Sequence, residues 1–228
     1  MVMSLPVMGN QLSPERLIDF ILSLARSDIL ALFSPLLSWL KTRLFPHAEG
    51  IYEVLDYEAR LDLCDPKGKL AIYTKRQRVR FLQDNVIAYQ DQAFGDGEIF
   101  AEYKCSPGVP VDRYEDGYRY RVLISLRQTK NRGDVEEFFI ERHIKDGFTK
   151  VDGYFQTNVD HRTDKLSLTV VFPPQRKPFE VSLVEQDTAR TTVLGGERMR
   201  QLPDGKWLVE WSTAKPKRFE SYILRWKW

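Results

Sequence analysis

Cysteine is scarce in this sequence, with Cys64 and Cys105 as the two that it holds. Two cysteines are too few for a disulfide framework. Neither has a CxxC partner or a neighbouring histidine cluster, so a structural zinc site is not indicated. Both fall in stretches typical of strands, where we expect them to be buried as small apolar residues. A single disulfide or a reactive thiol stays open as the alternative.

Recognisable catalytic motifs are also missing. The sequence contains no GxSxG, GxGxxG or GxxxxGK[ST] pattern, which argues against the enzyme classes that those motifs mark. His143 and His161 each lie near carboxylates, but neither has a ligand spacing such as HExxH. We therefore expect no metal, no cofactor and no catalytic residue, and the sequence favours a non-enzymatic protein.

Charge of one sign is not in excess. The 34 Lys and Arg residues nearly balance the 32 Asp and Glu residues, giving a formal net charge of +2, so nucleic acid binding has no support from net charge. The amino terminus lacks a basic region before an apolar core and a small-residue cleavage site, so we predict no secretory signal. With few cysteines and no signal, the expected location is cytoplasmic.

Residues 1–48 are predicted to form an N-terminal helical segment of two short helices. Ser13 and Pro14 suit the start of the first helix. Pro35 predicts a kink or a restart within the second helix, because it removes a backbone donor. Apolar residues recur along the second helix at three- and four-residue steps, on a face so broad that something must cover it.

That apolar face is too short for a transmembrane span. Its uncharged run from Ile29 to Leu40 covers about 18 Å as a helix, against about 30 Å of hydrocarbon. Three interpretations stay open: packing against the rest of the chain, docking of a protein partner or a second copy, and peripheral contact with a membrane surface. The partner-binding candidates on this face are Leu30, Phe33, Leu37, Trp39 and Leu40.

Residues 49–228 are predicted to form a β-rich domain. Short stretches of alternating polarity are separated by turn sequences such as DPKG, GDG and LPDG. The fold class we expect is mainly β, an antiparallel sandwich or barrel preceded by the helical segment. In the last strand, Tyr222, Leu224, Trp226 and Trp228 share one face, so we expect the end of the chain to belong to the core.

Three arginines, Arg76, Arg78 and Arg80, lie at two-residue spacing on one face of a predicted strand. A row of guanidinium groups can bind carboxylates or phosphates bidentately, which makes these residues a candidate site for a small anionic ligand. In a hairpin of residues 56–82, however, the facing strand would neutralise the row by cross-strand pairing. The carboxylates that this hairpin would supply are Asp56, Glu58 and Asp62.

The stretch "KCSPGVPVDRYEDGYRYR" is predicted to be a long connecting loop stiffened by prolines. Tyr114 and Tyr118 within it could form an amphipathic rim for a protein partner. Two hypotheses about function follow. The first is a non-enzymatic protein-interaction or regulatory module, in which the N-terminal helices dock a partner or a second copy. The second is a β-barrel or sandwich sensor for a small anionic ligand, for example a signalling nucleotide, whose helices act as an oligomerisation or membrane-surface effector.

Overall fold

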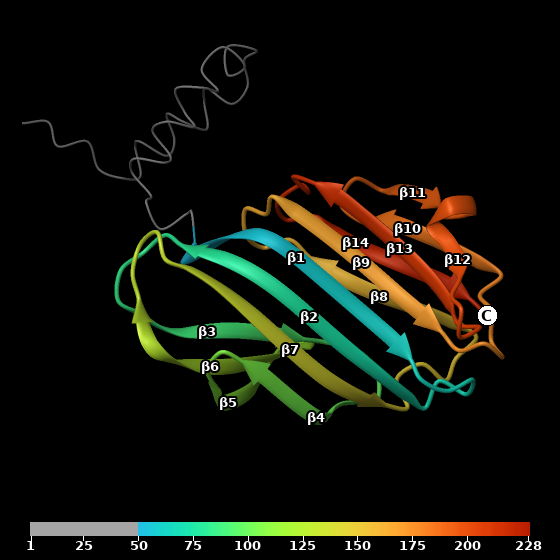
Figure 1. Cartoon of the computed structure of the whole chain (residues 1–228), viewed down its shortest axis with the longest axis horizontal. Coiled ribbons are helices and arrows are strands. Elements are labelled where there is room, and N and C mark those ends of the chain that lie inside the picture. The colour runs from blue at the N-terminus through green and yellow to red at the C-terminus, as the bar shows by residue number, and fades with distance from the viewer. Residues whose placement is uncertain (1–49) are drawn as a thin grey trace, which may run out of the picture. The chain divides into compact units, whose positions relative to one another are not determined.

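The computed structural model describes residues 50–228 of the chain, which form fourteen β-strands and one short 3-10 helix (Figure 1). No helix within this range has the length and hydrophobicity needed to traverse a bilayer. The elements are β1 (Tyr52–Leu63), β2 (Leu70–Phe81), β3 (Val86–Ala93), β4 (Glu98–Ser106), β5 (Val109–Asp116), β6 (Arg119–Lys130), β7 (Val135–Lys145), β8 (Asp152–Asn158), β9 (Lys165–Phe172), β10 (Glu180–Glu185), β11 (Arg190–Val193), η2 (Gly196–Arg198), β12 (Met199–Gln201), β13 (Trp207–Ala214) and β14 (Ser221–Lys227).

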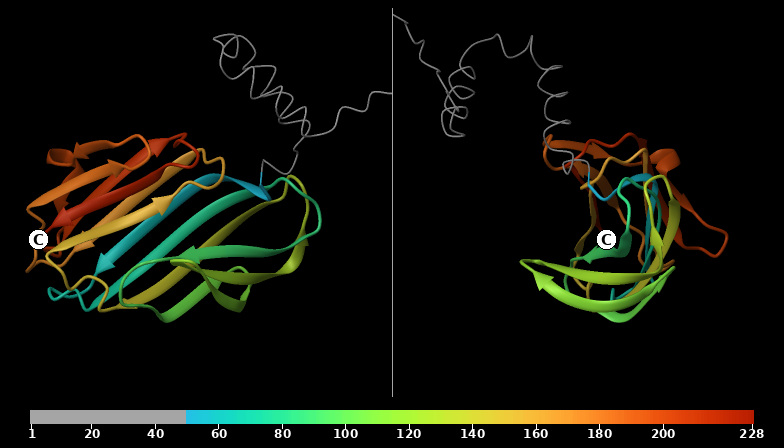
Figure 2. Two further views of the ribbon diagram at one scale, coloured as in Figure 1. Left: turned by 180° about the vertical axis from the view of Figure 1, so that it is seen from behind. Right: turned by 90° about the vertical axis from the view of Figure 1, so that its left-hand side faces the viewer.

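The strands form three sheets, which confirms the prediction of a mainly β body. The seven-stranded sheet has the order β12-β13-β9-β1-β2-β7-β4, the four-stranded sheet β11-β10-β14-β8, and the three-stranded sheet β3-β6-β5. In Figure 1 the three-stranded sheet lies at the lower left and the four-stranded sheet at the right; Figure 2 shows the same strands from two further sides.

The antiparallel pairing expected from the sequence has one exception among the strands of residues 50–228. β1 and β9 run parallel, in a register from Tyr57 opposite Leu166 to Asp62 opposite Val171. A parallel pair needs a long crossover connection, and here strands β2 to β8 supply it. No local pattern in the sequence signals a pairing between strands this far apart.

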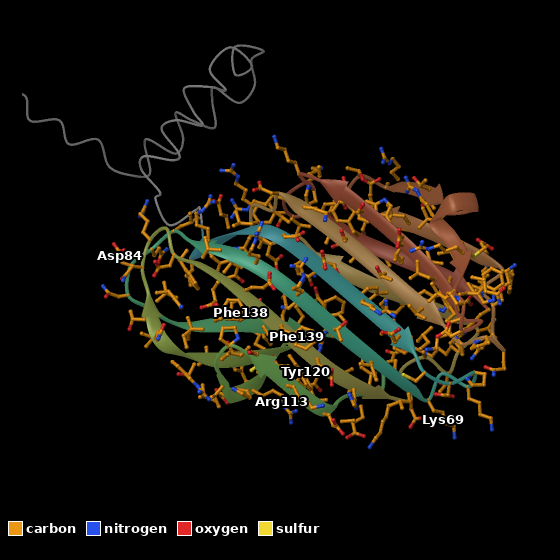
Figure 3. The ribbon with its side chains drawn as sticks, viewed as in Figure 1. Lys69, Asp84, Arg113, Tyr120, Phe138 and Phe139 are labelled. Carbon is orange, nitrogen blue, oxygen red and sulfur yellow. The ribbon has the colours of Figure 1, made fainter. Side chains whose placement is uncertain are left out.

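The inner face of the seven-stranded sheet follows the two-residue period of each strand. Phe138 and Phe139 are neighbours on β7 (Figure 3), yet Phe138 is fully buried and Phe139 is 44% exposed, because successive side chains point to opposite faces. In β1 the register shifts between Val54 and Asp56, where the strand bulges. Because of this extra residue, Val54 and Ala59 both face inward although their numbers differ in parity.

Two hydrophobic clusters lie against this inner face. One cluster joins it to β8, β10 and β14 of the four-stranded sheet, with Leu168, Leu183 and Leu224 at its centre. The other joins it to β3 and β6 of the three-stranded sheet, with Ile124 and Phe138 at its centre. Both smaller sheets therefore cover the same face of the seven-stranded sheet, and the residues between the two clusters position the candidate site.

The stretch predicted to be a long loop is mostly strand, because it contains the end of β4, all of β5 and the start of β6. β5 pairs antiparallel with β6, with Pro110 opposite Ile124 and Tyr114 opposite Arg121. Proline is tolerated here because β5 is an edge strand, where a missing backbone donor breaks no ladder. Tyr114 and Tyr118 are 43% and 71% exposed, so both are accessible, and their role in partner binding stays a prediction.

The predictions for the N-terminal segment fall on residues outside the described range. These are its two helices, the domain boundary at residue 48, and the partner-binding candidates Leu30, Phe33, Leu37, Trp39 and Leu40. They stay predictions.

The end of the chain is core, as predicted. Trp226 is 2% exposed, and its ring contacts Phe172 edge-on with centroids 5.4 Å apart and stacks on Phe148 at 6.0 Å. The expected burial of both cysteines is wrong, since Cys64 is exposed and Cys105 is half-buried. Cys64 follows the last residue of β1, so it lies in the turn instead of on the inner face.

Candidate functional site

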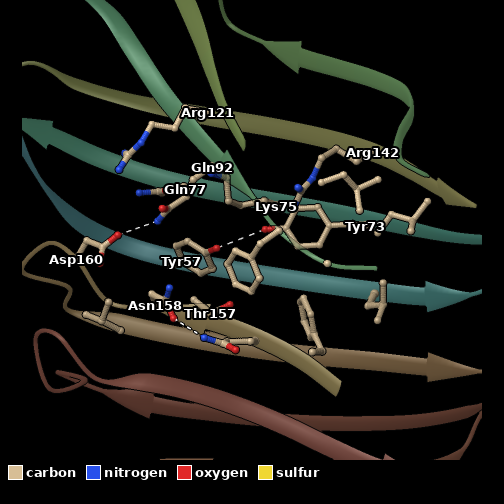
Figure 4. Close-up of a pocket in the computed structure, with 18 of the residues that line it drawn as sticks. Tyr57, Tyr73, Lys75, Gln77, Gln92, Arg121, Arg142, Thr157, Asn158 and Asp160 are labelled. Carbon is tan, nitrogen blue, oxygen red and sulfur yellow. Dashed lines mark hydrogen bonds between the residues drawn. The ribbon is translucent and has the colours of Figure 1, made fainter. Parts of the chain in front are cut away.

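A cavity of about 450 Å³ lies where the two hydrophobic clusters meet the inner face of the seven-stranded sheet (Figure 4). Its lining comes from β1, β2, β4, β7 and β9 of that sheet, from β3 and β6 of the three-stranded sheet, from β8 of the four-stranded sheet, and from connecting segments. β3 and β8 are both edge strands, so the cavity lies where the two smaller sheets end. A volume of this size suits a small organic molecule.

Strand β2 explains why polar groups line a cavity inside a hydrophobic body. Its inward-facing row reads Ala71, Tyr73, Lys75, Gln77 and Val79, so it is apolar at its ends and polar in the middle. All five side chains are at most 6% exposed. Burying a polar group is unfavourable unless the group is hydrogen-bonded. The hydrogen-bond partners of Lys75 and Gln77 therefore determine whether these two residues are available to a ligand.

Lys75 and Gln77 belong to a buried hydrogen-bond network. The Lys75 Nζ atom lies 2.5 Å from Asp91 Oδ1 on β3 and donates to the Tyr89 hydroxyl at 3.1 Å. The Tyr89 hydroxyl donates in turn to Gln77 Oε1 at 2.8 Å, and Tyr103 donates to Asp91 Oδ2 at 3.1 Å. Because each charge has an opposite partner and further hydrogen bonds, this network is internally neutral.

Burial and charge set the protonation of this network. Burial alone would lower the pKa of Lys75, but the carboxylate of Asp91 outweighs it, so the pKa of Lys75 is raised and the amine stays protonated. Burial, followed by the charge of Asp91, raises the pKa of Tyr89 well above its ordinary value. Lys75 is therefore an ammonium ion at neutral pH and cannot serve as a nucleophile there.

Arg142 lines the cavity from β7. It lies on the inward row of that strand between Ile140 and Ile144, and its side chain is 6% exposed. Its guanidinium group lies over the ring of Tyr73, 4.1 Å from the ring centroid, and 6.0 Å from the centroid of Phe100. Its Nε atom is buried and has no hydrogen-bond partner among residues 50–228.

Aromatic rings supply much of the remaining wall. Tyr57 and Tyr73 lie on neighbouring strands with their hydroxyls 3.4 Å apart (Figure 4). Tyr73 meets Phe155 of β8 edge-on, with ring centroids 5.9 Å apart. Rings at this spacing present flat apolar surfaces to a ligand, and the tyrosine hydroxyls add hydrogen-bonding groups at their ends.

Polar side chains join β3 to the segment that follows β8 at one side of the cavity. Gln92 on β3 donates from Nε2 to Asp160 Oδ2, at 2.8 Å, in the segment that follows β8. Arg119 donates to Gln92 Oε1 at 3.3 Å and lies 4.0 Å from the Asp160 carboxylate. These contacts link the ends of the two smaller sheets, and Asp160 is 41% exposed, so the link is solvent-accessible.

His161 lines the same cavity and packs against Tyr52 with the two rings tilted, their centroids 4.2 Å apart. Burial lowers the pKa of His161, and Arg218 adds to this while Asp160 opposes it, so the ring is favoured in its neutral form. Its Nδ1 atom has no hydrogen-bond partner among residues 50–228. His143 lies on the outer face, with Nε2 3.2 Å from Glu141. No group of three or more metal-binding side chains occurs in this range.

The three arginines singled out in the sequence lie on the outer face of β2, and none of them lines the cavity. Arg76 pairs with Asp56 and Glu137 at 3.0 Å and, more closely, with Glu58. Arg80 pairs with Glu53 at 2.8 Å, and Arg78 is exposed.

The hairpin of β1 and β2 thus neutralises Arg76 as the alternative interpretation expected, with Asp56 and Glu58 in the predicted role. Asp62 is an exception, because it forms its ion pair with Arg60 on its own strand. Ligand binding by Arg76, Arg78 and Arg80 gains no support from this geometry.

The buried charged residues at the cavity wall and directly behind it carried a signal that the sequence reasoning missed. Lys75, Asp91 and Arg142 each occupy the apolar phase of a strand, where a charged side chain has to point into the core. Each belongs to a different strand. The alternation of a single strand could therefore have identified them one by one as unusual, but not that they come together.

Comparisons with known proteins assign no family. No family model and no curated protein matches the chain. Among solved structures, one similar fold is a protein from Parabacteroides distasonis described as a "putative protease", with a TM-score of 0.47 and 8% sequence identity. The match covers 78% of this chain and 40% of that protein, so the chain spans less than half of its length. A similarity this distant carries no argument about activity.

Proposed function

We propose that residues 50–228 form a receptor domain that binds a small organic molecule in the cavity between the two hydrophobic clusters. In this proposal the three sheets act as an antiparallel-rich sandwich whose covering layer is divided, and the division leaves the cavity accessible. The observation that carries it is the polar centre of β2, where Lys75 and Gln77 interrupt an otherwise apolar inward row beside a cavity of about 450 Å³.

Small-molecule sites typically combine apolar and aromatic walls with a few convergent polar groups. Tyr57, Tyr73 and Phe155 provide the walls, and Gln77 and Arg142 provide polar groups. This proposal retains the sensor hypothesis from the sequence and moves its site from the outer arginine row to the interior.

The protein-interaction hypothesis depends on residues 1–48 and stays a separate prediction. In a sensor, these residues would transmit ligand binding to a partner or a second copy. If they are an appended effector, their deletion leaves the β domain folded and removes self-association measured by light scattering.

The binding function can be tested with 1-aminoanthracene, an uncharged fluorophore that brightens in apolar surroundings. We expect saturable binding of one dye per full-length chain. Ala88 on β3 lines the cavity, so Ala88→Trp should weaken dye binding at least tenfold. Ile87→Trp is the matched control, because Ile87 is the neighbouring residue, is 66% exposed and does not line the cavity.

Two results would refute the proposed function. One is the absence of saturable binding both by this dye and by the naphthyl compounds used below. The other is equal binding by wild type, Ala88→Trp and Ile87→Trp, since the bound dye would then lie outside the cavity.

A further inference from the structure

The position of Arg142 is unusual for an arginine in a β protein. It lies in the middle of the inward row of β7, with Phe138 and Ile140 on one side and Ile144 on the other. Its neighbours across the ladders are Tyr73 on β2 and Tyr103 on β4. The group is therefore held among apolar and aromatic side chains, at 6% exposure, on the wall of a cavity.

No counter-ion balances Arg142 among residues 50–228. The ion pairs of this range do not include it, its side chain has no hydrogen bond there, and its buried Nε atom is unsatisfied. Lys75 offers the contrast within the same cavity, because it has both Asp91 and Tyr89 as partners. Burying a charge without a partner is strongly unfavourable, so the guanidinium group favours the binding of an anion at this point of the cavity wall.

The groups around Arg142 do not supply such an anion. The two oxygens of Asp91 are engaged by Lys75 and by Tyr103. The rings of Tyr73 and Phe100 stabilise a cation through their faces, but they leave the donors at the edge of the guanidinium plane unpaired. An acceptor from outside the described range, positioned in the cavity, would satisfy those donors.

We propose that Arg142 anchors the carboxylate of the ligand, and that the ligand is a small amphipathic organic acid with a single negative charge. Guanidinium donors match the two oxygens of a carboxylate. The count of buried charges favours a monoanion over a phosphate dianion, because Lys75 and Asp91 cancel each other and leave Arg142 as the one uncompensated buried charge at the cavity. The apolar part of the acid would lie against Tyr57, Tyr73 and Phe155.

This proposal rests on the proposed binding function and adds the charge class of the ligand. It is tested by isothermal titration calorimetry of the full chain with 2-naphthoate and with 2-naphthamide, which match in shape and differ in charge. We expect wild type to bind the acid at least tenfold more tightly than the amide. Arg142→Met should bind both compounds with the same affinity, while Arg78→Met, an exposed arginine on the outer face, should keep the wild-type preference.

A third compound, 2-naphthyl phosphate, distinguishes the two kinds of anion. We expect it to bind more weakly than the acid, and tighter binding would overturn the assignment to a monoanion. The stability of the ligand-free variant provides a second readout. If Arg142 serves to bind an anion, the Arg142→Met variant melts at the wild-type temperature or above it. If Arg142 instead stabilises the fold, the variant melts at a lower temperature than wild type.

Equal affinity of wild type for the acid and the amide overturns the proposal and leaves the binding function intact. A preference for the acid that survives in Arg142→Met also overturns it. Because the first comparison uses wild type alone, it decides the matter even if Arg142→Met does not fold. Failure of the binding function is recognised separately, by the absence of saturable binding of any of these compounds or of 1-aminoanthracene.

Discussion

The Lys75 ammonium lies 2.5 Å from the Asp91 carboxylate, and the two side chains are 5% and 1% exposed. The pair joins β2 of the seven-stranded sheet to β3 of the three-stranded sheet, between the two hydrophobic clusters. A buried pair of this kind contributes little net stability over an apolar pair of equal volume, but removal of one partner leaves an uncompensated charge. This asymmetry gives the first prediction.

We expect Asp91→Asn to lower the free energy of unfolding by about 3–5 kcal/mol, because it leaves the Lys75 ammonium buried without a counter-ion. The double variant Lys75→Met/Asp91→Leu should be more stable than Asp91→Asn alone. Urea denaturation measures both. Asp96→Asn is the control, because Asp96 pairs with Lys150 on the exposed surface. An Asp91→Asn protein as stable as the Asp96→Asn protein would show that breaking the Lys75–Asp91 pair does not lower the free energy of unfolding.

The second prediction concerns alkaline pH. Burial raises the pKa of Tyr52 and of Tyr89 well above the ordinary value, and Asp91 raises that of Lys75 against the opposing effect of burial. In the unfolded chain these groups lose their protons near pH 10. The folded protein thus binds more protons above that pH, and stability present below about pH 10 is lost as pH rises further.

We therefore expect a constant urea midpoint from pH 7 to 9 and a falling midpoint above pH 10. Ionisation of the buried tyrosines, followed by tyrosinate absorbance, should coincide with unfolding. Tyr52→Phe should reduce the loss, whereas Tyr118→Phe should not, because Tyr118 is 71% exposed. A midpoint at pH 10.5 equal to that at pH 7.5 would contradict the prediction.

The third prediction uses the close approach of Gly153 to Trp226. A Cβ atom at Gly153 would lie 2.4 Å from the indole ring, which is buried and cannot swing away. We expect Gly153→Ala to cost about 1–3 kcal/mol through overpacking. Gly195→Ala is the matched control, because Gly195 has an extended backbone and open space around its Cβ position. Equal melting temperatures of the two variants would refute the prediction.

The fourth prediction concerns the end of the chain. Trp226 packs on Phe172 and Phe148 and is 2% exposed, so Trp226→Ala should lower the free energy of unfolding by about 3–5 kcal/mol. Deletion of residues 226–228 should abolish soluble folding. Phe179→Ala, at a site 70% exposed, should have little effect. A soluble truncated protein with a cooperative thermal transition would contradict this prediction.

Sequence reasoning predicted the local features of the body well. The alternation in β2 and in β14 correctly assigned which residues face inward, because the period of a strand is a property of the strand alone. The hairpin of β1 and β2 and the pairing of Arg76 with Glu58 followed from the same local rule. β5 was missed because prolines normally argue against a strand, and its position at an edge is not visible in its own sequence.

The candidate site was beyond sequence reasoning for a different reason. Lys75 and Arg142 line the cavity from two neighbouring strands, β2 and β7, and only the stacking of the sheets brings Asp91 of β3 to Lys75. The arginine row attracted attention because its charges lie at two-residue spacing on one face of a single strand, yet Arg76 is paired on the outer surface. Charged residues on the apolar phase of a strand were the better indicator of a site than charged residues on the polar phase.

The parallel pairing of β1 with β9 and the central place of β14 in its sheet bear on how this chain is made. During synthesis β1 emerges early, but its second edge stays open until β9 has left the ribosome. The four-stranded sheet needs β14 to lie between β10 and β8. A nascent chain therefore cannot complete the seven-stranded or the four-stranded sheet until β13 and β14 have emerged, so we expect slow folding and a dependence on chaperones that bind exposed strands.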